Sequence, residues 1–317
     1  MITKRQYIIL SFYLTRALFL GGGLSLLVGL SKNDVLVTGI LGMLLGYFIL
    51  FLFFKKGKVN NFFVSLIAIS VLIINTLANT TLTSTYLLFS TPTFIIVLIF
   101  FLALLYSIKK DFKVIGRICE IFIVIAAIEI IFAIIGLVPL VKIDKMFPMF
   151  ETRFIDIIKG IIVFTGASVL PNILLINYKG EHKFKDVSIG YIIGSLLMIT
   201  VLFLVISIYG SEFASLARFP EFLILKKIDF LGYFSNVENI LVTEWMINIL
   251  ISGFVCMKVL KDIIPKKLFY LIVLLIVLGS EFLLNRSYVN VLLVKQYFYY
   301  IAFLLIICSL IIRKKAN

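Results

Sequence analysis

Long apolar runs follow one another through almost the whole of this chain. Each run of about 20 residues could cross ~30 Å of hydrocarbon as a helix, and none shows the alternation of a membrane β-barrel strand. Of 317 residues, 62% are hydrophobic and 15% are charged, whereas a soluble domain is roughly half apolar and a quarter charged. The sequence therefore predicts an all-α polytopic membrane protein and excludes soluble, disordered, collagen-like and coiled-coil classes.

The apolar runs predict ten transmembrane helices in a single transmembrane domain over residues 1–317. The predicted spans are Tyr7–Leu30, Val35–Phe54, Phe62–Phe89, Thr93–Ile108, Val114–Val138, Ile155–Ile176, Val187–Tyr209, Val237–Leu260, Leu268–Leu284 and Val291–Ile312. Most Lys and Arg residues fall in segments on the side of the N-terminus, so both termini are predicted to be cytoplasmic. In the long outer segment after the seventh span, we expect a short helix on the membrane surface within Phe213–Leu231.

The net charge of +14 is explained by these basic cytoplasmic segments, so no nucleic-acid partner is expected. Cys119, Cys256 and Cys308 lie in or beside apolar spans without CxxC spacing, as small core residues do. The one histidine, His182, lies in a charged loop. We therefore expect no metal site and no cofactor. An enzyme is not expected either, because no nucleophile–base pair is visible.

Small residues interrupt the first and sixth predicted spans near their middles. The interruptions are Gly21-Gly22-Gly23 and Thr165-Gly166-Ala167-Ser168. They lie five helices apart, and five helices per half reverse the orientation of the second half. The sequence therefore predicts a 5+5 inverted repeat with helices 1 and 6 broken, as in many transporters. The first repeat covers about residues 7–138 and the second about 155–312.

The predicted breaks are candidate ligand-binding segments. An unwound stretch exposes N–H and C=O groups, which hydrocarbon tolerates only where they line a cavity. The half-helix that starts near Leu24 and Ser25 would direct its positive dipole end towards that cavity. A substrate carboxylate would fit there. The alternative is that these small residues only allow close helix packing.

Polar residues within the third predicted span form a second candidate. Asn75 and Asn79 share one helical face, and such polarity within a span indicates contact with protein or water rather than lipid. These amides could bind an amino group or order water. Hydrogen bonding between helices explains them equally well.

Three ionisable residues within spans form a possible proton or charge relay, because charges inside a membrane are costly and usually functional. Arg16 precedes the first glycines and could hold a carboxylate, pair with an acidic neighbour or snorkel towards the membrane edge. Glu129 lies near the centre of its span and is a candidate proton carrier. Glu244 lies in the outer half of the eighth span, where a structural role is the alternative.

Several motifs resemble one family. They include Ile2-Thr3-Lys4-Arg5-Gln6, Phe164–Ser168 followed by Leu170-Pro171-Asn172, and the block Leu216-Ala217-Arg218-Phe219-Pro220-Glu221. The sequence resembles the spore germination permease family, the B-subunits of nutrient germinant receptors, within the amino acid–polyamine–organocation superfamily. The resemblance implies a LeuT-type fold in the inner membrane of a bacterial spore. It also implies sensing of a small nutrient, typically an amino acid, together with A-type and C-type partner subunits.

Of the family's site, the glycine breaks carry over: Gly21, Gly22, Gly23, Gly166, Ala167 and Ser168. The first hypothesis is a ligand-sensing receptor subunit. An ordinary amino acid transporter, proton-coupled, would share the fold and the site. A third possibility is a subunit that has lost its ligand and only scaffolds a complex.

Overall fold

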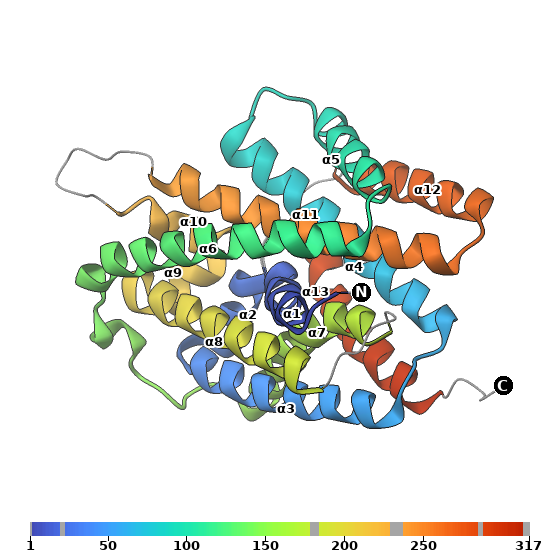
Figure 1. The fold of residues 1–317 in the computed structure, drawn as a ribbon. Helices are drawn as coiled ribbons and strands as arrows, with labels where there is room; N and C mark the ends of the chain where they lie inside the picture. Colours follow the sequence, from blue (N-terminus) through green and yellow to red (C-terminus); the bar gives the residue numbers. More distant parts are fainter. Residues whose placement is uncertain (1, 20–22, 178–183, 229–236, 285–287, 313–317) are drawn as a thin grey trace.

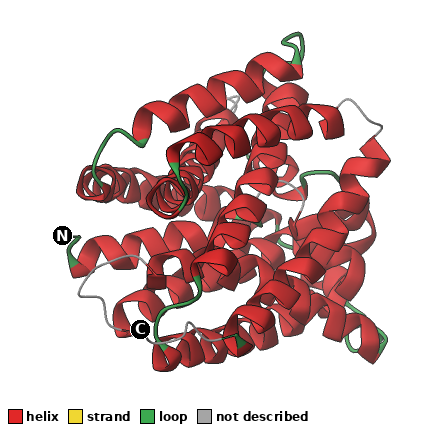
Figure 2. Cartoon of the chain, turned by 90° about the vertical axis from the view of Figure 1, so that its right-hand side faces the viewer, coloured by secondary structure: helices red, strands yellow, loops and turns green. Residues whose placement is uncertain are grey.

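The computed structural model describes residues 2–19, 23–177, 184–228, 237–284 and 288–312, and every long element among them is a helix (Figures 1 and 2). The α-helices are α1 (Lys4–Ala17), α2 (Gly23–Ser31), α3 (Val35–Lys56), α4 (Asn61–Leu82), α5 (Thr93–Ser107), α6 (Phe112–Leu137), α7 (Phe154–Asn177), α8 (Phe184–Tyr209), α9 (Ser211–Leu216), α10 (Pro220–Leu225), α11 (Val237–Ile263), α12 (Lys266–Leu284) and α13 (Tyr288–Ile311).

Each predicted span contains a helix, and the first contains two, α1 and α2. Local chemistry sets several of the helix ends. At the start of α1, the Thr3 hydroxyl accepts a bond from the Gln6 backbone N–H, and the Gln6 side chain accepts one from Thr3 N–H. This reciprocal capping satisfies donors that an isolated helix end leaves free. Asn60 caps α4 through the N–H of Phe62.

Six stretches of the described chain are long and apolar enough to cross a membrane: Gly23–Lys56, Asn61–Leu87, Phe112–Leu140, Phe154–Ile176, Phe184–Tyr209 and Lys266–Leu284. The stretch that contains α6 is the most apolar of them and the least buried, with Ile121 at 65% exposure. The stretch that contains α7 is the least apolar and the most buried. This inverse relation is expected where lipid rather than water covers the outside of the protein, and the chain is a membrane protein.

Helix α1 occupies the centre of the bundle, where Figure 1 shows it end-on. It contacts α6, α7, α8 and α11, and every residue from Ile9 to Ala17 is buried. Gly190 and Gly194 of α8 face the α1 backbone, and a Cβ on Gly194 would lie 3.0 Å from the carbonyl oxygen of Phe12. Glycines four residues apart allow such close approach of two helices in a membrane.

The segment after α8, which was predicted to lie on the outer side, differs from the prediction. It forms two short helices, and α10 is packed into the protein, with Pro220, Phe222 and Leu225 buried. Phe222 lies 4.2 Å from Tyr86 between ring centroids. The expected helix on the membrane surface is therefore wrong for α10, because its apolar side chains pack against protein. Residues 229–231 of the expected helix lie outside the described residues.

The segment before α7 is fixed to the turn between α2 and α3. Asp34 is 1% exposed and accepts hydrogen bonds from the backbone N–H groups of Phe150 and Thr152, at 2.5 and 3.0 Å. The Thr152 hydroxyl donates to the carbonyl of Ser31 at 2.9 Å. These bonds hold the segment before α7 against the end of α2.

Candidate functional site

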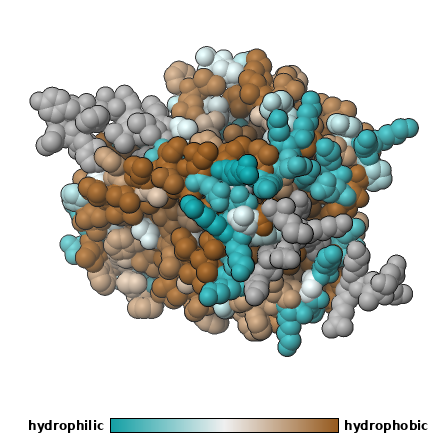
Figure 3. Space-filling model, viewed as in Figure 1, coloured by the Kyte–Doolittle hydropathy of each residue, from teal (hydrophilic) through white to brown (hydrophobic). Residues whose placement is uncertain are grey.

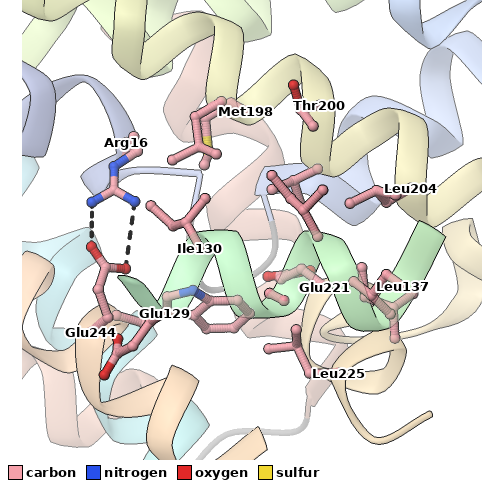
Figure 4. A pocket seen from close by; sticks show the side chains of 16 residues that line it. Arg16, Glu129, Ile130, Leu137, Met198, Thr200, Leu204, Glu221, Leu225 and Glu244 are labelled. Carbon is pink, nitrogen blue, oxygen red and sulfur yellow. Dashed lines mark hydrogen bonds and ion pairs between the residues drawn. The ribbon is translucent and has the colours of Figure 1, made fainter. Parts of the chain in front are cut away.

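A buried ion pair joins the end of α1 to α11. The Arg16 guanidinium contacts both carboxylate oxygens of Glu244, with Nη1 3.4 Å from Oε2 and a closer contact between Nη2 and Oε1 (Figure 4). The two side chains are 2% and 7% exposed. The guanidinium carbon also lies 4.1 Å from the ring centroid of Phe12. Of the predicted roles for Arg16, the structure shows pairing with an acidic neighbour.

This pair is costly to place in a membrane protein. Desolvation of two charges costs several kcal/mol per ion, and their mutual attraction offsets that cost only in good geometry. Two-point contact between a guanidinium and a carboxylate is the strong form of such pairs. The Nε of Arg16 is buried and has no hydrogen-bond partner among the described residues. Arg16 therefore retains one donor that a bound molecule or water could use.

The ion pair lines a pocket of about 590 Å³, a volume that includes the space open to its surroundings. Two more carboxyl groups, Glu129 from α6 and Glu221 from α10, line the same pocket (Figure 4). Apart from Thr200, its remaining lining is apolar, contributed by α6, α8, α10 and α11. The structure thus brings the three predicted relay residues, Arg16, Glu129 and Glu244, together in one place.

The pocket holds more acidic than basic groups. Glu129 is partly buried, and its Oε2 atom has no hydrogen-bond partner in the described part of the chain. Glu221 is 1% exposed. With Arg16 engaged by Glu244, the Glu129 carboxyl group remains to attract a proton or an ammonium group. An apolar pocket with few charged groups of this kind suits a small molecule that carries charge at one end.

Sequence reasoning did not single out Glu221, which entered only as the last residue of the family motif. It lies in the first turn of the short helix α10, directly after Pro220. Its signal was an acidic residue between apolar neighbours, in Phe219-Pro220-Glu221-Phe222-Leu223. Nothing in that signal revealed that α10 folds back into the bundle.

The break in the first predicted span is present, because α1 ends at Ala17 and α2 begins at Gly23. Gly21 and Gly22 lie outside the described residues. The Tyr299 hydroxyl of α13 donates to the carbonyl of Leu18 at 2.6 Å. A Cβ on Gly23 would lie 2.8 Å from that hydroxyl oxygen. A side chain from α13 thus occupies the space beside the break.

Two further predicted site residues follow the break in α2. Leu24 is fully buried, and Ser25 is partly buried. Neither lines the pocket that contains Arg16. Helix α2 thus begins near the break, whereas Arg16, which lines the pocket, belongs to α1.

The predicted break in the sixth span is wrong. Helix α7 runs without interruption from Phe154 to Asn177. Thr165 donates to the carbonyl of Gly42 in α3 at 3.1 Å, and Ser168 donates to the carbonyl of Phe164 in its own helix at 2.8 Å. Both hydroxyls thus donate to backbone carbonyls, and the helix remains continuous around them.

Close packing explains the glycine in that helix. A Cβ on Gly166 would lie 2.9 Å from the backbone oxygen of Tyr299, and Ala167 is fully buried. One glycine costs a helix only about 1 kcal/mol, less than backbone groups left unpaired in hydrocarbon. The stretch Thr165–Ser168 therefore belongs to a continuous helix, and at Gly166 the alternative of close helix packing holds.

The polar face of α4 makes a bond between helices. The Asn75 amide donates to the Ser252 hydroxyl of α11 at 2.8 Å, and Asn79 is 5% exposed. Asn248, one turn after Glu244, is fully buried, and neither polar atom of its side chain has a hydrogen-bond partner among the described residues. Neither Asn75 nor Asn79 lines the charged pocket. For Asn75, the structure therefore shows the second alternative, a hydrogen bond between helices.

Comparison with known proteins gives one family. The model of a family described as spore germination protein matches residues 35–290. A search of curated proteins finds no match. The matched range covers most of the chain and includes Glu129, Glu221 and Glu244, while Arg16 lies before it. On this match the chain belongs to the spore germination protein family, the one that its motifs resemble.

Proposed function

We propose that this chain is the nutrient-sensing B-subunit of a spore germinant receptor and that its ligand binds in the pocket of Arg16, Glu129, Glu221 and Glu244. Family membership supports the germination role. The observation that carries the location is the buried two-point pair of Arg16 and Glu244 in a pocket with two further carboxyl groups. In this proposal the chain binds its ligand without converting it.

The chemistry of the pocket fits an amino acid. Arg16 is a two-point partner for a ligand carboxylate, and Glu129 would accept bonds from the ligand ammonium group. The apolar lining, which includes Met198 and Leu225, would receive an apolar side chain. Ligand binding exchanges the internal pair of Arg16 and Glu244 for contacts to the ligand.

This exchange provides a signal. A ligand shifts a two-state protein only by its difference in affinity for the two states. The carboxylate of the ligand would compete with Glu244 for Arg16 and so weaken the link between α1 and α11. Because α1 ends beside a break, it could then move relative to α2. A-type and C-type subunits in the spore inner membrane would receive the change, with both termini of this chain in the cytoplasm.

Thermal unfolding of the purified protein with a panel of L-amino acids tests this proposal. For any amino acid that stabilises the chain, its carboxamide and its N-acetyl derivative are measured beside it. The proposal predicts that both derivatives lose the stabilisation, because each removes one of the two charges. Equal stabilisation by the carboxamide would contradict a role of Arg16 in carboxylate binding.

One observation favours a second candidate, a proton-coupled amino acid transporter. Glu129 has a buried carboxylate oxygen without a hydrogen-bond partner among the described residues, and intramembrane carboxylates carry protons in many transporters. Uptake of labelled amino acid into vesicles that contain only this chain distinguishes the two. Accumulation that a pH gradient drives and that Glu129→Gln abolishes would favour transport; ligand binding without accumulation favours the receptor.

A further inference from the structure

A wholly apolar groove lies between α1, α6 and α8, separate from the charged pocket but adjoining it. Its lining includes Ile8 and Phe12 of α1, Ile123 and Ala127 of α6, and Ile193 and Leu197 of α8. The groove encloses about 820 Å³, including the space open to its surroundings. Ile193 is 50% exposed, so the groove opens towards the outside of the bundle.

The three helices that form the groove begin at the same end of the bundle. Arg5 of α1 lies 4.0 Å from Glu120 of α6. A Cβ on Gly116 of α6 would lie 2.8 Å from the side chain of Gln6, and Gly190 of α8 packs on the backbone of α1. Figure 1 shows the starts of α6 and α8 on the side where the chain begins.

Exposed basic side chains surround this end of the groove. They are Lys4 and Arg5 at the start of α1, Lys113 and Arg117 at the start of α6, and Lys185 at the start of α8. Of the nearby acidic groups, Glu120 is bonded to Gln6 and Arg5, Asp186 is buried, and Asp111 is exposed. In Figure 3, hydrophilic side chains gather around the start of the chain, and hydrophobic ones cover α6 and α8 beyond it.

The distance from the basic residues to the far end of the groove is comparable to the length of one lipid. From Arg117 to Ile131, α6 extends about 20 Å at the helical rise, compared with roughly 15 Å of hydrocarbon in one leaflet. A headgroup at the basic residues would thus place an acyl chain along the groove. The helix dipoles add positive potential at the same end, and basic sites between membrane helices favour anionic lipid headgroups.

We propose that this groove binds one acyl chain of an anionic phospholipid, whose phosphate contacts the basic side chains at the starts of α1, α6 and α8. The groove and the charged pocket share two lining residues, Ile130 and Leu197. The end of the acyl chain therefore reaches the side wall of the charged pocket. The lipid seals that wall against the bilayer and links pocket shape to lipid charge.

The chain carries its own reporter for this contact. Trp245 is its one tryptophan and lines the charged pocket with Ile130 and Leu197. The full chain is reconstituted in phosphatidylcholine vesicles that contain increasing mole fractions of a lipid brominated near the ends of its acyl chains. One series uses brominated phosphatidylglycerol and the other uses brominated phosphatidylcholine. Bromine quenches Trp245 fluorescence at short range. Quenching by brominated phosphatidylglycerol is expected to occur at about fivefold lower mole fraction, the effect of a single basic residue near a membrane surface.

Two variants separate the groove from the bilayer around it. Ala127→Phe fills the groove, whereas Ile128→Phe adds bulk at the next residue of α6, which does not line it. The preference for phosphatidylglycerol should disappear in Ala127→Phe and persist in Ile128→Phe. The surface variant Lys113→Gln/Arg117→Gln leaves the groove unfilled and should also lose the preference.

Equal quenching by both lipids in the unchanged protein would overturn the proposal, because it would show no preference for the anionic headgroup. A preference that persists in both Ala127→Phe and the Lys113/Arg117 variant would overturn it as well. Far-UV circular dichroism of each variant establishes that the helices are intact. Because the Lys113 and Arg117 side chains are exposed, their variant tests the headgroup contact even if Ala127→Phe does not fold.

Discussion

Arg16 of α1 and Glu244 of α11 form a two-point ion pair in the interior of the bundle, with side chains that are 2% and 7% exposed. Removal of one member leaves an uncompensated buried charge. We expect Arg16→Gln and Glu244→Gln each to lower the free energy of unfolding by about 3–5 kcal/mol. The double variant Arg16→Met/Glu244→Leu should recover most of that loss, because it leaves no charge unpaired. Thermal unfolding in detergent measures all three.

The pair of Arg5 and Glu120 is the matched control. Its atoms are 4.0 Å apart, and Arg5 is 70% exposed. Arg5→Gln should change the free energy of unfolding by less than about 1 kcal/mol, as exposed pairs do. If Arg16→Gln were no more destabilising than Arg5→Gln, the description of a tightly coupled buried pair would be wrong.

Gly166 is predicted to be a packing position. In Gly166→Ala the new Cβ would lie 2.9 Å from the backbone oxygen of Tyr299, an atom that cannot rotate away. We expect a lower melting temperature. In the control Gly279→Ala the Cβ meets nothing within 4 Å, so that variant should gain up to about 1 kcal/mol of helix propensity.

A thiol-reactive dye measures the melting temperatures of these two variants, because Cys119 and Cys256 are buried and become accessible on unfolding. Exposed Cys308 supplies a constant baseline. A melting temperature for Gly166→Ala equal to or above that of Gly279→Ala would argue against close contact between α7 and α13.

The Tyr299 hydroxyl is predicted to hold the break in the first span. Tyr299→Phe removes the donor to the Leu18 carbonyl and should cost about 0.5–1.5 kcal/mol. Faster amide exchange at Gly23, whose N–H bonds to the carbonyl of Phe19, is expected. Tyr297→Phe, on the same helix and 62% exposed, serves as the control and should leave that exchange unchanged. Unchanged exchange in Tyr299→Phe would contradict the role.

Asn75 and Ser252 are predicted to be coupled. A double-mutant cycle with Asn75→Ala and Ser252→Ala measures their interaction free energy, which should be about 0.6 kcal/mol and no more than about 1.7, as between other membrane helices. A coupling indistinguishable from zero would mean that the bond between α4 and α11 contributes nothing to stability.

The sequence predicted helix positions well because hydrophobic length alone defines a membrane span. Each predicted span contains a helix, and the first contains two, α1 and α2. The prediction of a break at Gly166 failed, because a stretch of small residues is equally compatible with a broken helix and with close helix packing. Only the position of Tyr299 on α13 decides between them. The inverted repeat of LeuT type remains a prediction.

The candidate site was predicted in part. Arg16, Glu129 and Glu244 were identified because charges inside spans are rare, and they line one pocket. Their grouping could not be predicted, because it depends on how α1, α6 and α11 meet. Glu221 was missed because the outer segment was expected on the membrane surface, whereas α10 is buried within the protein.

Equilibrium binding of a radiolabelled amino acid, selected by the thermal-unfolding screen, to this chain in vesicles tests the central claim most directly. Arg16→Gln/Glu244→Gln should bind it at least about 30-fold more weakly, the effect of losing a buried charged contact. The control Arg153→Gln/Asp156→Asn, which neutralises an ion pair away from the pocket, should bind it as the unchanged protein does. Affinity in Arg16→Gln/Glu244→Gln equal to that of the unchanged protein would contradict a nutrient site at Arg16.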